Sequence, residues 1–350
     1  NENKLVPETL LSLVSQGILH NSVMNRCMVA ATSFLVPHSP IQSRKIKIEP
    51  IAALQCKMGV PYDLKHGQVR NFHKLPSGLN LEVIEQKSDV GNTSYQPLVF
   101  VHGSYHAAWC WAEQWLPFFS NHGFDCYAVS LLGQGESDSP SGSIPGTLET
   151  HASDIGDFID KTLKSPPVLL GHSFGGLVVQ YYLSRMGNHS YPHLSRAALI
   201  CSVPPTGNTG IVWRYIFSKP ITAYKVTRSL AAKAFQTDLA LCKETFFSEA
   251  MDDELLMRYQ KLMKESSRTA MFDLRKLNAS LPVASKSKRS IEVLVIGASG
   301  DMIVDKEALM ETGRFYEVCP VFIEGVGHDV MLDFAWEHAA TSVLSWLTTI

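Results

Sequence analysis

The stretch Val168-Leu169-Leu170-Gly171-His172-Ser173-Phe174-Gly175-Gly176 joins a short apolar run to an apolar segment with helical spacing. A serine on a sharp turn between a strand and a helix adopts a strained backbone, which needs small residues two positions before and after it. Gly171 and Gly175 meet that need, and Gly176 lets the following helix pack closely on a sheet. The stretch therefore predicts that Ser173 is a nucleophile, held at the end of a strand.

Strand-like and helix-like runs alternate along the chain from residue 79 onward. Short, continuous apolar runs are typical of strands that are buried on both faces of a parallel sheet. This alternation predicts an α/β fold with a mostly parallel central sheet flanked by helices. The expected strands are 79–84, 97–101, 124–132, 167–170, 197–203, 291–297 and 319–323, and the expected helices include 148–163, 177–183 and 331–347.

The alternation stops between residues 206 and 290, where the pattern becomes helical and rich in aromatic residues. Apolar side chains between 255 and 263 fall on one face of a helix that is expected to begin near Asp252. An insertion of this kind between two strands predicts a helical cap at 206–290. The α/β core is then expected to consist of 76–205 and 291–350.

A serine hydroxyl needs a base, and His328 is the predicted one. It follows the last expected strand in the turn Gly325-Val326-Gly327-His328, whose glycines allow the ring to turn back over the sheet edge. His172 adjoins the serine but should point away from it, and His338 lies inside the terminal helix. Loop or surface positions are expected for five further histidines: His106, His122, His151, His189 and His193.

A carboxylate should fix the tautomer of the imidazole and stabilise its charged form. Asp301 follows the expected strand 291–297 through a short turn, which places it at the same sheet edge. Asp305 is the alternative, but stabilisation of a helix N-terminus explains its position. The predicted catalytic residues are therefore Ser173, Asp301 and His328.

Acyl transfer also needs N–H groups that bind the developing oxyanion. The backbone N–H of Phe174, at the expected start of a helix, is one predicted donor. The second should come from the loop after 97–101, where Gly103 allows the main chain to turn inward. The N–H of Ser104 is the predicted donor in this loop, with that of Tyr105 as the alternative.

Taken together, these motifs resemble those of the α/β-hydrolase superfamily over about 79–350. The order Ser173, Asp301, His328 along the chain is also the order of that superfamily. The resemblance implies an α/β-hydrolase fold and a serine esterase or lipase-like activity. It rests on His102-Gly103, Gly133-Gln134-Gly135-Glu136-Ser137, the turn around Ser173, the acid turn at 297–304 and Gly327-His328.

The segment 102–111 further resembles the oxyanion-loop region of plant methylesterases and hydroxynitrile lyases. The chain also departs from these families. The turn at 131–137 resembles general esterases and relatives of epoxide hydrolases, and Ser130 and Gln134 stand where many members carry Asp and His. Asp329 follows the predicted base where such lyases carry Lys, which argues against cyanohydrin cleavage.

The predicted reaction is hydrolysis of a carboxylic ester through an acyl-enzyme, with a hydrophobic acyl or alcohol group suggested by the aromatic cap. Epoxide hydrolases and haloalkane dehalogenases use a carboxylate nucleophile, so Ser173 argues against both. Thioester hydrolysis would use the same groups and stays open. A receptor for a small ligand on a hydrolase scaffold, with slow turnover or none, also stays open. No H-E-x-x-H motif or clustered Cys/His spacing is present, so we expect no metal or other cofactor.

Composition narrows the class of partner. The 350 residues carry a net charge of −2 without a concentrated basic face, so no nucleic acid partner is expected. No apolar stretch is long enough for a transmembrane segment, while peripheral membrane contact stays open. The seven cysteines form no C-x-x-C pair, which favours a reducing compartment, with one disulfide left open.

Residues 1–75 are expected to form an N-terminal extension outside the core. Between 21 and 48 there is no Asp or Glu, although Arg, Lys and Ser are present. This composition is typical of organellar transit segments, with a disordered tail as the alternative. It predicts a plastid location, with the mitochondrion and the cytoplasm as alternatives.

Overall fold

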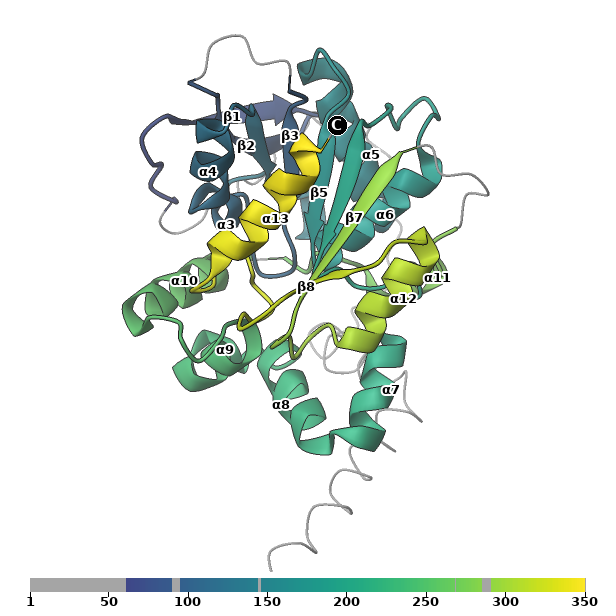
Figure 1. The fold of residues 1–350 in the computed structure, drawn as a ribbon. Helices are drawn as coiled ribbons and strands as arrows, with labels where there is room; N and C mark the ends of the chain where they lie inside the picture. The colour runs from purple at the N-terminus through teal and green to yellow at the C-terminus, as the bar shows by residue number, and fades with distance from the viewer. Residues whose placement is uncertain (1–60, 90–94, 144–145, 268, 285–290, 350) are drawn as a thin grey trace, which may run out of the picture. The chain divides into compact units, whose positions relative to one another are not determined.

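The core of the molecule is one sheet of eight strands (Figure 1). The computed structural model describes residues 61–89, 95–143, 146–267, 269–284 and 291–349. The strands are β1 (Gln68–Lys74), β2 (Asn80–Gln86), β3 (Leu98–Val101), β4 (Cys126–Val129), β5 (Val168–His172), β6 (Arg196–Ile200), β7 (Glu292–Ala298) and β8 (Val321–Ile323).

The strand order is β1-β2-β4-β3-β5-β6-β7-β8. β1 pairs antiparallel with β2, and β2 pairs antiparallel with β4. The pairs from β4 onward are parallel, so that the strands from β4 to β8 share one direction. The predicted α/β fold with a mostly parallel central sheet is confirmed.

The central strands are buried on both faces, as their continuous apolar sequences indicate. In β3, Leu98 and Phe100 face one apolar cluster, whereas Val99 and Val101 face another, because successive side chains of a strand alternate. The first cluster includes α3 (Trp109–Ala112), α4 (Trp115–Asn121) and α13 (Trp336–Thr348). The second includes α5 (Leu148–Thr162), α6 (Phe174–Arg185) and α12 (Lys306–Tyr316).

The sheet begins earlier in the chain than the boundary expected at residue 75. β1 lies at 68–74, within the part that was expected to stay outside the core, and it pairs with β2 along its whole length. It is an edge strand with exposed Val69 and Phe72, so its sequence lacks the continuous apolar pattern of the inner strands. The predicted transit segment lies outside the described residues.

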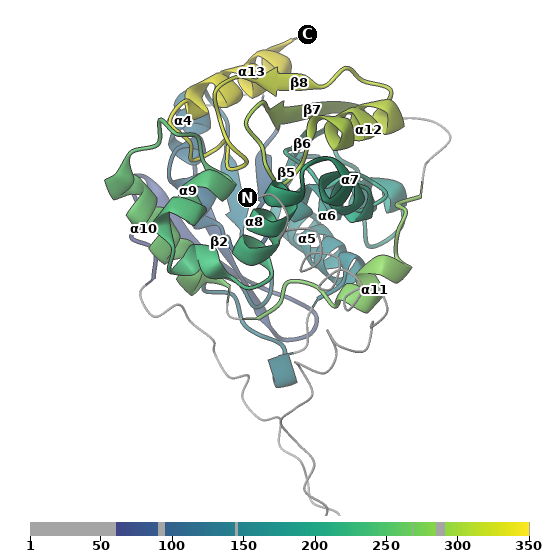
Figure 2. The same ribbon diagram turned by 90° about the horizontal axis from the view of Figure 1, so that it is seen from below.

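Among the described residues, five α-helices lie between β6 and β7, in the region where the sequence pattern becomes helical. We refer to them together as the helical insertion. Figure 2 shows four of them, α7 to α10, in front of the strands when the sheet is viewed from one end. The helices are α7 (Thr209–Ser218), α8 (Pro220–Leu230), α9 (Leu239–Phe246), α10 (Asp253–Ser266) and α11 (Leu274–Ala279).

Helix boundaries in this region follow local capping chemistry. Asp252 precedes α10, as expected, and its carboxylate accepts hydrogen bonds from the N–H groups of Glu254 and Leu255. Asp238 and Asp273 cap α9 and α11 in the same way. Short 3-10 turns occur at Ser141–Ser143 and Ala234–Gln236.

The terminal helix starts five residues later than the pattern at 331–347 predicts. Residues 329–335 instead form turns in which the N–H groups of Leu332 and Asp333 donate to the carbonyl of Asp329. The Asp333 carboxylate also accepts hydrogen bonds from the N–H groups of Gly327 and Ser248. This carboxylate therefore holds the turn in place, and α13 begins only at Trp336.

Two expectations from the sequence concern the state of the cysteines and the presence of a transmembrane segment. Cys110, Cys126, Cys201, Cys242 and Cys319 are free thiols, and the other two cysteines of the chain lie outside the described residues. Among the helices of the described part, none has the length and apolar character that crossing a membrane requires.

The aromatic packing beneath the sheet predicts a strong effect of truncation. Phe119 is 0% exposed and packs against Phe100, Trp115 and Phe124. Phe119→Ala should lower the free energy of unfolding by about 3–5 kcal/mol, measured by urea denaturation. Phe217→Ala, at a side chain that is 79% exposed, is the control and should change it by less than about 0.5 kcal/mol. Equal effects of the two changes would contradict this account of the core.

Candidate active site

Ser173 lies between β5 and α6 in a backbone conformation that L-residues rarely adopt. Its φ is 53° and its ψ is −121°. A conformation of this kind costs about 1–3 kcal/mol and persists only where the surrounding structure enforces it. The N–H of Ser173 donates to the carbonyl of Ile200, and its own carbonyl accepts from Val203, so the turn is held from β6.

The glycines around Ser173 stand where any side chain would collide with the backbone or with a neighbouring residue. A Cβ on Gly171 would lie 2.6 Å from the carbonyl oxygen of Gly175. A Cβ on Gly175 would lie 2.3 Å from the carbonyl oxygen of His102, at the end of β3. On Gly176 it would meet the Ser202 hydroxyl at 2.3 Å. The glycines thus let the turn pack directly between the two neighbouring strands.

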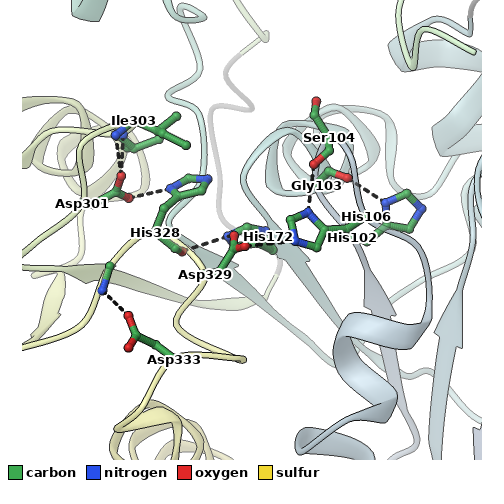
Figure 3. Close-up of polar contacts among 12 residues, drawn as sticks. His102, Gly103, Ser104, His106, His172, Asp301, Ile303, His328, Asp329 and Asp333 are labelled. Carbon is green, nitrogen blue, oxygen red and sulfur yellow. Dashed lines mark hydrogen bonds and ion pairs between the residues drawn. The ribbon is translucent and has the colours of Figure 1, made fainter. Parts of the chain in front are cut away.

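Asp301 and His328 meet at the same edge of the sheet, although they follow different strands. Nδ1 of His328 lies 2.7 Å from Oδ2 of Asp301 (Figure 3). The other carboxylate oxygen of Asp301 accepts hydrogen bonds from the N–H groups of Ile303 and Val304. With Asp301 as acceptor, the proton of the neutral ring lies on Nδ1, which leaves Nε2 as a base.

The surroundings of His328 act on its pKa in opposite directions. Burial disfavours the charged ring and lowers the pKa, but the Asp301 carboxylate raises it by its charge and by its hydrogen bond. The charge of Asp329 raises it further, and the net result is a pKa above the ordinary value of 6.5. The site therefore stabilises the imidazolium that forms when the ring accepts a proton.

Asp305, the alternative acid, makes different contacts. Its carboxylate caps α12 by accepting from the N–H of Ala308, and it forms a two-pronged ion pair with Arg214 on α7. Asp301, not Asp305, is hydrogen-bonded to His328. His338 is exposed on α13.

The loop after β3 packs against the turn that carries Ser173. A Cβ on Gly103 would lie 2.9 Å from the Cβ of Ser173 and 2.9 Å from Nδ1 of His172. Within the described part of the chain, the N–H groups of Ser104 and Phe174 have no hydrogen-bond acceptor. Tyr105 has a φ of 67°, and its hydroxyl donates to the carbonyl of Leu230 at the end of α8.

Two charged or polar residues of this region were missed as functional candidates. His106 was expected to be a loop or surface residue; it does lie in a loop, but it is buried and its Nε2 lies 3.0 Å from Oδ2 of Asp329. Asp329 is also buried, next to His328 in sequence. His151, likewise expected at the surface, is buried and bonds the carbonyl of Met271. No sequence signal marked His106, because its partner lies in a distant loop.

Among the described residues, two groups bring possible metal-ligating atoms within 4.8 Å of one another. They are His172, His328 and Asp329, and Cys201, Asp301 and His328. Both groups include His328, whose Nδ1 is already bonded to Asp301. The proximity of these atoms does not in itself indicate a metal centre.

Comparison with curated proteins gives several relatives that match part of the chain. The non-heme chloroperoxidase of Streptomyces lividans is 33% identical over 117 residues, which is 33% of this chain and 40% of that protein. A candidate chloroplastic methylesterase of Arabidopsis thaliana, methylesterase 15, is 24% identical over 48% of this chain and 39% of its own length. The chain thus spans about two fifths of the length of these curated relatives.

Solved structures match over a larger part of the chain. An esterase from Exiguobacterium antarcticum matches with a TM-score of 0.62 at 19% identity, covering 80% of this chain and 100% of that one. An epoxide hydrolase from Vigna radiata matches with a TM-score of 0.58 at 19% identity, covering 82% and 100%. At this identity the likeness concerns the fold.

The family comparison covers strands β3 to β8 and the three predicted catalytic residues. The model of the alpha/beta hydrolase family matches residues 98–340, which include Ser173, Asp301 and His328. With the sheet order and the strained turn after β5, this match establishes the family. The chain belongs to the alpha/beta hydrolase family.

Proposed function

We propose that this protein is a serine hydrolase that cleaves a carboxylic ester through an acyl-enzyme. The observation that carries the proposal is the hydrogen bond of 2.7 Å between His328 and Asp301, at the sheet edge where β5 ends in the strained Ser173. The esterase fold neighbour and the methylesterase relative support hydrolysis of an ester.

In the proposed first half-reaction, Oγ of Ser173 attacks the carbonyl carbon of the ester while Nε2 of His328 takes the hydroxyl proton. The intermediate collapses as His328 gives this proton to the leaving alkoxide, and the alcohol departs. Water then attacks the acyl-enzyme, with His328 again taking a proton. The acid is released and Ser173 regains its hydrogen. Asp301 keeps its charge and stabilises the imidazolium throughout.

The backbone N–H groups of Ser104 and Phe174 are the proposed donors to the oxyanion. Two observations support this assignment. Neither group has an acceptor within the described part of the chain, and Gly103 brings the Ser104 loop against Ser173. Phe174 is also the first residue of α6, where the positive end of the helix dipole favours an anion.

We propose a substrate with a hydrophobic acyl or alcohol group, and a location in the plastid. The region between β6 and β7 supports the first, since Phe235 packs on Tyr105 of the proposed oxyanion loop and Phe246 packs on Phe235. The acid-poor composition of 21–48 supports the second, together with the chloroplastic methylesterase relatives. No part of the proposal involves a nucleic acid.

The nucleophile can be tested with a fluorophosphonate probe, which labels activated serines. The wild-type protein should be labelled at Ser173, and Ser173→Ala should abolish both labelling and hydrolysis of p-nitrophenyl esters. Ser184→Ala is the matched control, because its hydroxyl bonds only within α6 and lies outside the proposed site. Equal labelling of wild type and Ser173→Ala would falsify the proposal, and ligand binding without turnover would favour a receptor.

The base can be tested through the pH dependence of kcat/KM. His328 acts only when neutral, and its pKa is raised, so activity should rise with pH with an apparent pKa above 6.5. In Asp301→Asn the ring loses its main stabilising charge, so the acid limb should move to lower pH. kcat should also fall by about 10⁴-fold, because the amide favours the wrong tautomer. If the acid limb of the pH profile does not move in Asp301→Asn, that limb reports the titration of a group other than His328.

A peripheral contact with lipid is part of the proposal. α7 and α8 expose Trp213, Phe217, Ile221 and Tyr224, with the rings of Trp213 and Phe217 stacked 5.6 Å apart. Residues 206–237 contain five Lys or Arg and no Asp or Glu. Exposed aromatic residues beside basic ones are typical of helices that lie on an anionic membrane surface.

This contact can be measured by co-sedimentation with vesicles of phosphatidylcholine and phosphatidylglycerol. The double variant Phe217→Ser/Ile221→Ser should bind at least about tenfold more weakly, since burying one such side chain contributes about 1.5–3 kcal/mol. Phe334→Ser is the control, at an aromatic side chain that is 68% exposed and lies outside α7 and α8. Binding that is absent in the wild type, or unchanged in the double variant, would rule out the contact.

A further inference from the structure

Three buried polar residues lie beside the proposed site without a role in the proposed chemistry. They are His106, His172 and Asp329. His106 lies in the loop after β3, two residues after Ser104. His172 is the last residue of β5 and directly precedes Ser173, and Asp329 directly follows His328 in the turn after β8. The segments that carry Ser104, Ser173 and His328 therefore each carry one of these residues as well.

Direct contacts join the three residues to one another and to the loops (Figure 3). Nε2 of His106 lies 3.0 Å from Oδ2 of Asp329, and Nδ1 of His106 lies 2.8 Å from the carbonyl oxygen of Ser104. Nε2 of His172 lies 3.0 Å from the carbonyl oxygen of His328 and 3.6 Å from Oδ1 of Asp329.

The acceptors fix where the ring protons lie. The carbonyl oxygen of Ser104 can only accept, so Nδ1 of His106 carries a hydrogen. Nε2 of His106 faces the carboxylate of Asp329. Burial raises the pKa of this carboxylate, but His106 and His172 lower it, and the net pKa lies below the ordinary value. The contact between His106 and Asp329 is therefore one that favours the ionised carboxylate.

The tautomer of His172 is fixed in the same way. Burial lowers its pKa to about 3, so the ring is neutral, with its hydrogen on Nε2 toward the carbonyl of His328. All three side chains of the group are buried.

Burial of the Asp329 carboxylate carries a large desolvation free energy. The side chain is 0% exposed, and within the described part of the chain it accepts no well-aligned hydrogen bond, so its polar contacts are those with the imidazoles of His106 at 3.0 Å and His172 at 3.6 Å. A buried ion pair often stabilises a fold no better than apolar residues of similar volume. The stability of the core therefore gives no reason for this pair, whereas its position between the catalytic loops does.

We propose that His106, Asp329 and His172 form a positioning network that fixes the Ser104 loop, Ser173 and His328 relative to one another. Asp329 and His106 set the separation between the base and the oxyanion loop. His172, which directly precedes Ser173, links the nucleophile's turn to the carbonyl of His328. The inference rests on the proposed function, because positioning has a measurable effect only if these groups carry out the reaction.

The network can be tested with Asp329→Asn, His106→Gln and the double variant, assayed for hydrolysis of p-nitrophenyl acetate. Each single variant should lower kcat by about 10²-fold, the cost of a small misplacement of reacting groups, with KM changed less than about twofold. The rate of labelling by a fluorophosphonate should fall in parallel with kcat. The double variant should lose no more than either single one, because both remove the same interaction.

His338→Gln, at an exposed histidine on α13, is the control and should keep wild-type kcat. The pair His106→Phe/Asp329→Leu keeps the experiment decisive if a single variant fails to fold. This apolar pair should retain thermal stability and still show the reduced kcat. Wild-type kcat in the apolar pair, or losses that multiply in the double variant, would overturn the network.

The outcome separates the network from the proposed function itself. A wild-type protein that is not labelled at Ser173 overturns the proposed function. A wild-type protein that is labelled, with folded Asp329→Asn and His106→Gln variants that keep its kcat, overturns only the network.

Discussion

The backbone of Ser173 at a φ of 53° is the constraint on which the rest of the site depends. The turn is possible because Gly175 lies close to the carbonyl of His102, which follows β3, and Gly176 lies close to Ser202, which follows β6. The same contacts place the end of β3, and hence the Ser104 loop, against Ser173, the proposed nucleophile. A strained conformation that costs about 1–3 kcal/mol is thus maintained by close packing between three neighbouring strands.

The two acids near His328 have opposite environments, which indicates different roles. Asp301 accepts hydrogen bonds from two backbone N–H groups and from His328, so its charge is fully compensated and held in one direction. Asp329 has no well-aligned hydrogen bond from the described residues and is faced by the imidazoles of His106 and His172. The first arrangement suits an acid that orients a base, and the second suits one that holds two loops together.

How much the sequence could predict depends on how local the signal is. Ser173, Asp301 and His328 each follow an apolar strand within a short glycine-containing turn, so their placement at one sheet edge follows from the parallel sheet. The burial of His106 depends on Asp329, which is remote in sequence, and neither flanking sequence carries a sign of it. β1 was missed for a related reason: as an edge strand with exposed side chains it lacks the apolar run that marks the inner strands.

Two helices of the helical insertion contact the region of the candidate site. Arg214 on α7 pairs with Asp305, four residues after Asp301, and Ile211 and Tyr215 pack on Val304 and Ala308. The hydroxyl of Tyr105, in the loop after β3, donates to the carbonyl of Leu230 at the end of α8. A displacement of α7 and α8 would therefore change contacts of the Asp301 turn and of the Ser104 loop together. The helices that are proposed to meet lipid thus contact two of the segments that are proposed to carry the chemistry.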